Sequence, residues 1–331
     1  MNTMFSTKKI VWSLAGIFLL FYVIGVYWSL EPAPINIHAE VTQAAKTENV
    51  APVVGYTTTT VLIKVSETLL NKPGGYLSND IMPPSLLLDN MPAWEFGVLE
   101  MVRDMALVMR KDFSRSQSQS LVNQHLLEAQ PRFNIDNTSW AVPSAESEYT
   151  EAITLLYAYR SALVSNNGSN KAQFYARADN LRAYIEEVQK RLGSYSHRLS
   201  LSVGRDQVNT DLAGDKPAQQ SSQGDSHLQL KTSWWKIDDV FYEARGATWA
   251  LLQLLRAIEI DFNSVLENKN AKISLQQIIR ELEATQETLW SPMILNGSGF
   301  GFVANHSLVM ANYISRANAA LIDLNELLTK G

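Results

Sequence analysis

The 331-residue sequence contains no cysteine. This absence excludes disulfide frameworks, thiol nucleophiles, cysteine-ligated zinc sites and iron–sulfur clusters. The motifs of zinc proteases, serine hydrolases and P-loop nucleotide-binding proteins are also missing. Basic residues are in no excess, because 28 Lys and Arg stand against 33 Asp and Glu, and the net charge of −5 argues against a nucleic-acid partner. We therefore expect no cofactor, no metal site and no catalytic residues that carry a sequence signature.

One long uncharged run, residues 10–30, dominates the N-terminus. As a helix its 21 residues would extend about 30 Å, the thickness of the hydrocarbon core of a bilayer. Lys8 and Lys9 precede the run and Glu31 follows it, so the positive-inside rule predicts a cytoplasmic stub at 1–9 and an exported remainder. A cleavable signal peptide is the alternative, but its apolar core is normally 7–15 residues long. The sequence thus predicts an uncleaved anchor in the lipid bilayer.

Helical periodicity dominates the rest of the chain. Apolar residues recur at 4-3-4-3 spacing from Trp94 to Val108, and the segment 144–164 opens with Ser and Glu, as helix starts prefer. The segment TTTTVLIKV at 57–65 fits either a short strand or the start of a helix. Further helices are expected at 235–268, 272–290 and 305–328. The predicted fold class is all-α.

The segment 170–200 carries the most regular apolar stripe. Asn170 with Gln173 has the pattern of a capping box, as do Ser274 and Gln277 farther along the chain. A strict a/d alternation follows Gln173. Such a stripe either pairs two copies of the chain as a homo-oligomer or forms one arm of an antiparallel helical hairpin within the chain.

Two segments lack an apolar face. Residues 31–55 are rich in Pro, Ala and polar residues, which is typical of a spacer. Residues 203–230 are rich in Gln, Gly, Asp and Ser, which predicts a disordered linker. These segments divide the exported part into a helical lobe at 56–202 and a second helical lobe at 231–331.

The two lobes share landmarks when the sequence is shifted by about 149 residues. The matching positions are Glu95 and Glu243, Gly97 and Gly246, Phe113 and Phe262, and Trp140 and Trp290. An internal duplication would produce this pattern by giving each lobe the same helices. Coincidence among amphipathic helices is the alternative.

Acidic and aromatic residues near the starts of the two main helices are the best candidates for a ligand groove. They are Asp89, Glu95, Asp238, Asp239, Glu243, Arg245 and Trp249. Paired carboxylates beside aromatic rings can bind sugars or cationic groups, or a metal that prefers oxygen ligands. The structural alternative assigns the acidic residues to helix caps, favourable first-turn charges and ion pairs within the chain, and the aromatic residues to the core.

Three segments, GGYLSND at 74–80, LDNMPAWEFG at 88–97 and IDDVFYEARGATWAL at 237–251, resemble a family of uncharacterised single-span inner-membrane proteins of Gram-negative bacteria. That family is described only as a domain of unknown function. The resemblance extends over nearly the whole chain. It implies an inner-membrane protein whose helical domain faces the periplasm, and it implies no activity, cofactor or site.

The leading functional hypothesis is an interaction or scaffolding module of the cell envelope, tethered to the membrane, with envelope proteins as its partners. The absence of catalytic motifs favours a protein that is not an enzyme. The alternative is an envelope enzyme or ligand-binding protein that uses the acidic residues in an aromatic groove between the two lobes. An enzyme of that kind needs two carboxyl groups facing one cavity, one of them with a raised pKa.

Overall fold

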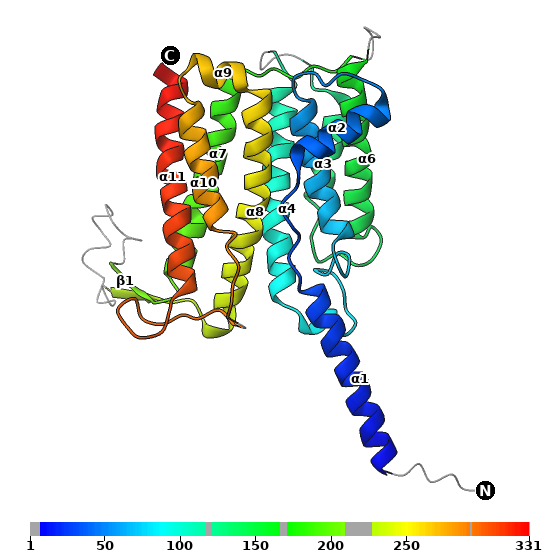
Figure 1. Ribbon diagram of the computed structural model, residues 1–331, viewed down its shortest axis with the longest axis vertical. Helices are drawn as coiled ribbons and strands as arrows, with labels where there is room; N and C mark the ends of the chain where they lie inside the picture. Colours follow the sequence, from blue (N-terminus) through cyan, green and yellow to red (C-terminus); the bar gives the residue numbers. More distant parts are fainter. Residues whose placement is uncertain (1–6, 117–120, 166–170, 209–226, 292, 331) are drawn as a thin grey trace, which may run out of the picture.

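A computed structural model describes residues 7–116, 121–165, 171–208, 227–291 and 293–330. Helices dominate, and Figure 1 shows α1 projecting from one end of an upright helical bundle, which we call the α1 end. The helices are α1 (Thr7–Trp28), α2 (Ile37–Glu48), α3 (Tyr56–Asn71), α4 (Asn90–Val108), α5 (Gln124–Phe133), α6 (Ala145–Val164), α7 (Ala178–Ser200), α8 (Ile237–Asp261), α9 (Asn263–Asn268), α10 (Lys272–Ala284) and α11 (His306–Lys330). Shorter segments are η1 (Ser85–Leu87), the π-helical η2 (Met109–Phe113), η4 (Trp234–Lys236), and strands β1 (Arg205–Val208) and β2 (His227–Leu230). The predicted all-α class is confirmed.

Most of the bundle consists of two groups of helices with the same internal contacts. The first group is α3, α4, α5 and α6, and the second is α7, α8, α10 and α11. In each group, the first and the third helix both pack on the second and on the fourth. Helices α4 and α8 join the groups and lie side by side (Figure 1). Helix α7, which the sequence analysis placed in the first lobe, packs mainly on α11 of the second group, and its Arg191 also pairs with Asp104 of α4. The division into two lobes stays a prediction.

Two glycines allow α4 and α8 to approach closely. A Cβ atom on Gly97 would lie 1.9 Å from the carbonyl oxygen of Glu243, and one on Gly246 would lie 2.0 Å from that of Trp94. Near the other end of the same pair, the rings of Phe113 and Phe262 are 5.1 Å apart. The contact is reciprocal, as in a symmetric dimer interface. Residues that the 149-residue shift equates thus meet across the α4–α8 contact, which is the arrangement a duplication would produce. The duplication itself stays a prediction.

Helix starts follow local side-chain chemistry in several places. Ser144 caps α6 by accepting a hydrogen bond from the backbone N–H of Ser147 at 3.3 Å. The cap of α3 comes from α8, because the Asp261 carboxylate accepts hydrogen bonds from the backbone N–H and the hydroxyl of Thr58, both at 2.7 Å. This cap explains why the ambiguous segment at 57–65 is helical.

The spacer prediction for residues 31–55 is wrong at its centre, where α2 forms. Asn36 caps the helix by accepting from the backbone N–H of Ala39 at 3.1 Å. Ile37 and Ala45 are buried against the bundle. Only Ile37, Val41 and Ala45, spaced four residues apart, face the core. The polar composition of the other positions therefore gave the helix too weak an apolar stripe to be predicted.

Helix α7 starts later than expected. Asn170, the first residue of the predicted capping box, lies outside the described residues, and residues 171–177, which include Gln173, are not helical. Phe174 instead packs on the rings of Phe113 and Phe262, at 5.1 and 5.7 Å. These contacts hold the chain extended up to Ala178.

The apolar stripe of α7 packs against α11 within the chain. Near its end, the Ser196 hydroxyl donates to the carbonyl of Ala311 at 3.2 Å, and Gly193 lies beside Asn318, so the two helices are antiparallel. This is the hairpin alternative of the sequence analysis. Association of two copies through 170–200 stays an untested prediction and would require α7 and α11 to separate.

Helix α10 is shorter than the predicted 272–290 and begins without the Ser274–Gln277 box. The Gln277 side chain instead donates to Glu281 at 2.8 Å. The helix ends at Ala284, and just beyond it the carbonyl of Thr285 accepts a hydrogen bond from Arg245 at 3.0 Å.

The predicted linker at 203–230 is ordered at both ends, where β1 and β2 pair antiparallel with Arg205 opposite Leu230. Its centre, 209–226, lies outside the described residues.

Candidate functional site at the α1 end

Lys72 and Glu95 form an ion pair that is enclosed by the first helix group. The Lys72 Nζ and Glu95 Oε1 atoms are 2.6 Å apart, and both side chains are 0% exposed. The Glu95 carboxylate also accepts hydrogen bonds from the backbone N–H groups of Leu77 and Ser78 and from the Ser78 hydroxyl. Burial raises the pKa of Glu95, whereas Lys72 and these donors lower it. The pair therefore ties the connection between α3 and α4 to the second turn of α4.

Arg198 and Glu243 form the corresponding ion pair of the second group. Both terminal nitrogens of Arg198 donate to the Glu243 carboxylate, with Nη1 2.6 Å from Oε1. The Arg198 side chain is 37% exposed and that of Glu243 is 10% exposed. In both groups, a basic residue near the end of the first helix pairs with a Glu near the start of the second.

The remaining predicted acidic residues lie at the starts of α4 and α8. Asp89 is exposed and accepts a hydrogen bond from the backbone N–H of Asn90 at 3.0 Å. Asp239 pairs with Lys236 at 2.7 Å. Burial raises the pKa of Asp238, and the nearby charge of Asp89 raises it further. Of the predicted set, Asp89 and Asp238 are thus brought close enough to interact.

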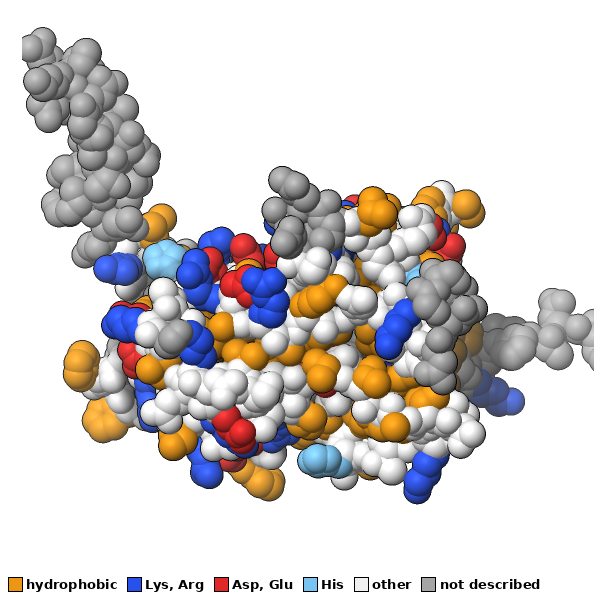
Figure 2. Space-filling view, turned by 90° about the horizontal axis from the view of Figure 1, so that it is seen from above, with side chains coloured by type: hydrophobic (Ala, Val, Ile, Leu, Met, Phe, Trp, Pro, Cys, Tyr) orange, Lys and Arg blue, Asp and Glu red, His pale blue; other side chains and the backbone are white. Residues whose placement is uncertain are grey.

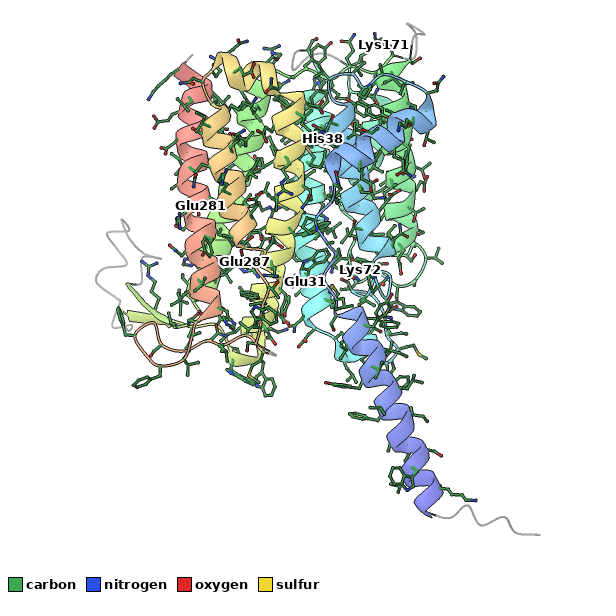
Figure 3. The ribbon with its side chains drawn as sticks, in the orientation of Figure 1. Glu31, His38, Lys72, Lys171, Glu281 and Glu287 are labelled. Carbon is green, nitrogen blue, oxygen red and sulfur yellow. The ribbon has the colours of Figure 1, made fainter. Side chains whose placement is uncertain are left out.

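Arg245 projects from α8 to the base of α1. Its Nε atom lies 2.8 Å from both carboxylate oxygens of Glu31, and its Nη1 donates to the carbonyl of Thr285. Only 7% of the Arg245 side chain and 25% of the Glu31 side chain are exposed. Figure 3 shows Glu31 at the junction between α1 and the bundle. The partner of Arg245 is therefore a residue next to the predicted anchor, not an acidic residue of the candidate groove.

Trp249, the last member of the predicted set, is buried between the two helix groups with its ring centroid 5.2 Å from that of Trp94. Each predicted residue therefore has the local role that the structural alternative gives it. Within the described residues, no group of three or more His, Asp or Glu side chains is arranged to hold a metal ion. The ligand groove between lobes stays a prediction, without support from these contacts.

A cavity of about 460 Å³ opens beside Arg245. It lies in the second group, where α10 ends early and leaves room between α8 and α11. Its walls include Phe241, Arg245, Leu289, Trp290, His306 and Tyr313. None of the predicted acidic side chains lines it. An apolar wall with Arg245, Glu287 and His306 among its polar lining residues suits a small amphiphilic molecule.

Residues at the base of α1 are packed into the bundle. Gly25 is buried, and a Cβ atom on it would lie 3.7 Å from the side chain of Leu88. A Cβ atom on Gly74 would come within 2.7 Å of the Trp28 ring, so this ring lies directly on the backbone of the α3–α4 connection. Together with Glu31, these contacts make the end of α1 a part of the folded domain.

Sequence reasoning missed Lys72, Arg198 and Glu31 as the partners of the candidate residues. Each partner is far away along the chain, and ion pairs of this kind have no sequence spacing that identifies them. The only available signal was the position of Glu31, directly after the apolar run.

The chain matches the model of one known protein family. The model of DUF2333, described as an uncharacterized protein family conserved in bacteria, matches residues 3–331. The chain belongs to this family. No curated protein and no solved structure matches it. The expected membership in an uncharacterised bacterial family is confirmed. The single span and the inner-membrane location stay predictions, and because the family description names no activity, the function of this DUF2333 protein is argued from its geometry.

Proposed function

We propose that this DUF2333 protein is a single-pass membrane protein whose helical domain is an interaction module of the bacterial cell envelope. Helix α1 contains one stretch, Lys9–Trp28, that is long and apolar enough to cross a membrane. Only 6% of that stretch is buried. A soluble protein would leave a large apolar surface in water, whereas a bilayer would cover it.

The observation that carries the proposal is the packing of residues 25–31. A signal peptide is cut just after its apolar core, in a segment that the protease must bind in extended form. Here Gly25 is buried beside Leu88, the Trp28 ring lies on Gly74, and Glu31 pairs with Arg245. Its integration into the domain supports an anchor that stays attached.

The charge pattern at the N-terminus supports one orientation. Lys8 and Lys9 precede the uncharged run at 10–30, and no acidic residue does. Because positive flanks stay in the cytoplasm, the domain would lie in the periplasm of a Gram-negative host.

An interaction role is favoured over an enzymatic one by the partners of the acidic residues. Glu95 and Glu243 are neutralised by Lys72 and Arg198, and neither faces the cavity beside Arg245. A general acid or base must reach a substrate proton, and these carboxylates are held by side chains instead. The outer faces of α10 and α11 remain available to envelope proteins.

The proposal is tested in cells with fusions and crosslinking. Alkaline phosphatase fused to the C-terminus should be active, and a green fluorescent protein fused there after Sec export should be dark. The full-length protein should resist extraction with alkaline carbonate. Reversal of the two reporters, or release by carbonate, would contradict the membrane topology.

The interaction role has its own readout. Amine-reactive crosslinking in intact cells, followed by mass spectrometry, should recover envelope proteins joined to lysines of the domain. The triple variant Asp238→Asn, Asp239→Asn, Glu243→Gln should alter folding or partner recovery and leave the turnover of envelope polymers unchanged. Hydrolysis of such a polymer by the purified protein, abolished in the triple variant, would favour the enzyme alternative instead.

A ligand-binding role is the second candidate, and the cavity beside Arg245 favours it. A fluorescent apolar probe should bind the full-length protein in detergent with one saturable site. Thr288 is exposed and lines the cavity, so Thr288→Trp should weaken binding by narrowing the entrance. The exposed Thr329 at the far end of α11 provides the control Thr329→Trp, which should bind as the unchanged protein does.

A further inference from the structure

Exposed aromatic side chains gather at one end of the bundle. Beyond α1, the exposed Trp and Phe residues of the described chain all belong to connections between helices. They are Trp140, Trp234, Trp235, Trp290, Phe300 and Phe302. Four aliphatic side chains between α3 and α4 are exposed as well: Ile81, Met82, Leu86 and Leu87. We call these residues together the aromatic end surface.

The connections that carry this surface converge at the α1 end. The α3–α4 connection lies against the base of α1, because Gly74 supports the Trp28 ring. The α5–α6 connection adjoins it, since the Tyr76 hydroxyl donates to the carbonyl of Asn137 at 3.0 Å. The parallel packing of α4 and α8 places Trp234 and Trp235, just before α8, at the same end. Figure 1 shows the α10–α11 connection, in orange, at this end too.

The opposite end of the bundle differs in composition. Figure 2 shows that face, where Lys, Arg, Asp and Glu side chains are spread among the hydrophobic ones. Its exposed hydrophobic side chains include Ile273 at the start of α10 and Leu121, but no exposed Trp or Phe of the described residues. The clustering of large aromatic rings is therefore specific to the α1 end.

Electrostatic attraction does not explain the aromatic end surface. Lys236, which lies beside Trp235, is paired with Asp239 at 2.7 Å. Lys231 and Arg205 lie at the same end, but so do Asp89, Asp136 and Asp238, so the surface has no excess of positive charge. Recruitment to anionic lipid needs a basic cluster. The chemistry of the surface is aromatic and aliphatic.

We propose that the aromatic end surface rests in the interfacial layer of the bilayer that α1 crosses, so that the domain is docked on lipid as well as tethered to it. This inference rests on the proposed membrane anchor. Trp rings favour the headgroup level of membranes because they combine an apolar ring with an N–H donor. Figure 1 shows α1 projecting from the end that carries these residues, so this end would face the bilayer that α1 crosses. Docking would bury side chains that water otherwise surrounds.

Single-cysteine probes test the docking directly, because the chain has no cysteine of its own. Phe300 and Met82 are 108% and 72% exposed, so Phe300→Cys and Met82→Cys alter no buried contact. Ile273, at 76% exposure, provides the matched control Ile273→Cys at the opposite end. Each full-length variant is labelled with a fluorescent bimane and reconstituted into phosphatidylcholine vesicles that contain a lipid with a nitroxide near its headgroup.

Labels at positions 300 and 82 should lose emission to the lipid nitroxide and resist quenching by aqueous iodide. The label at position 273 should show the reverse. Adding anionic lipid or salt should change neither result, since the surface is not basic. Equal behaviour of all three labels would overturn the docking.

The same vesicles separate docking from anchoring. After an alkaline wash, flotation with the vesicles reports the anchor, whatever the labels do. Protein that floats but carries water-exposed labels at positions 300 and 82 would refute docking while keeping the anchor. Labels that are shielded only when a cell extract is added, and never by lipid, would assign the aromatic end surface to a protein partner and would also refute the proposal. Protein that fails to float would overturn both.

Discussion

The two helix groups place an ion pair at equivalent positions but enclose it to different extents. Lys72 and Glu95 are completely buried, whereas Arg198 keeps more than a third of its surface in water. The difference comes from the connection that follows the first helix of each group. The α3–α4 connection folds back over Lys72 and donates two backbone hydrogen bonds to Glu95. The α7–α8 connection instead leaves toward β1 and β2.

The same arrangement of helices can therefore hold either a fully buried ion pair or a partly exposed one. A buried pair costs desolvation energy that only a complete set of partners offsets. A partly exposed pair is screened by water and contributes little. The first group therefore depends on its ion pair much more than the second does, and substitutions can measure the difference.

The largest effect is expected from Lys72→Met. This change leaves the Glu95 carboxylate buried without its counter-charge, which should lower the free energy of unfolding by about 3–5 kcal/mol. Guanidinium-induced unfolding of the full-length protein in mild detergent, followed by Trp fluorescence, measures the loss. The double variant Lys72→Met, Glu95→Gln should recover part of the stability because the amide oxygen still accepts hydrogen bonds. No recovery would mean that the pair is not the source of the effect.

The next effect tests the reciprocal α4–α8 contact. Gly97→Ala and Gly246→Ala each place a methyl group on a carbonyl of the facing helix, so each should cost about 1–3 kcal/mol. The two losses should be similar, because the two contacts are equivalent. Thermal unfolding measures both.

Gly193→Ala in α7 is the matched control. Its nearest neighbour beyond the helix backbone would be the Asn318 amide nitrogen at 3.7 Å. Ala favours a helix interior over Gly by about 1 kcal/mol, so this variant should gain stability. A gain at Gly97 or Gly246 would contradict the close approach.

A smaller effect is expected from Arg198→Met. Because the Arg198 side chain is 37% exposed, water screens its pair with Glu243. The loss should be about 1 kcal/mol or less. Both variants are measured under the same conditions. The difference between their losses in the free energy of unfolding then quantifies the effect of enclosing the ion pair. Equal losses for the two variants would show that enclosure does not decide the strength of the pair.

The smallest effect concerns pH at the start of α8. The raised pKa of Asp238 means that the folded protein holds this proton more tightly than the unfolded chain does. The resulting stabilisation is complete below the unfolded-state pKa, near 3.8, and is lost as pH rises through the folded-state value. At pH 7, Asp238→Asn should therefore raise stability by a few tenths of a kcal/mol, after allowance for solvent screening.

The pH dependence of Asp238→Asn is its internal control. The gain should vanish near pH 3, where the wild-type carboxyl group is also neutral. Asp136, whose pKa is lowered by hydrogen bonds from Thr138, should show the opposite sign, so that Asp136→Asn lowers stability at neutral pH. Melting temperatures at the two pH values measure both variants.

Local patterns predicted much of the fold. The stripe from Trp94 to Val108 specified α4, and Ser144 specified the start of α6, because periodicity and caps act between near neighbours. Helix α2 escaped prediction because His38, Glu40 and other polar residues diluted its short stripe. The start of α7 escaped because Phe174 serves an aromatic cluster formed by distant residues.

The candidate site was less predictable than the fold. The sequence singled out Glu95, Glu243 and Arg245, but the meaning of each depends on a partner that the fold supplies. Lys72, Arg198 and Glu31 lie 23 to 214 positions away from them. Burial and tertiary contact, not residue type, decide whether a carboxylate binds a ligand or closes an ion pair.

The account depends on the base of α1 being a permanent part of the domain. The intact mass of the mature protein, purified from bacterial membranes, tests this most directly. We predict the mass of the full chain, with at most the initiating methionine removed. A mature chain that begins near residue 31, without Gly25 and Trp28, would contradict the anchor and everything inferred from it.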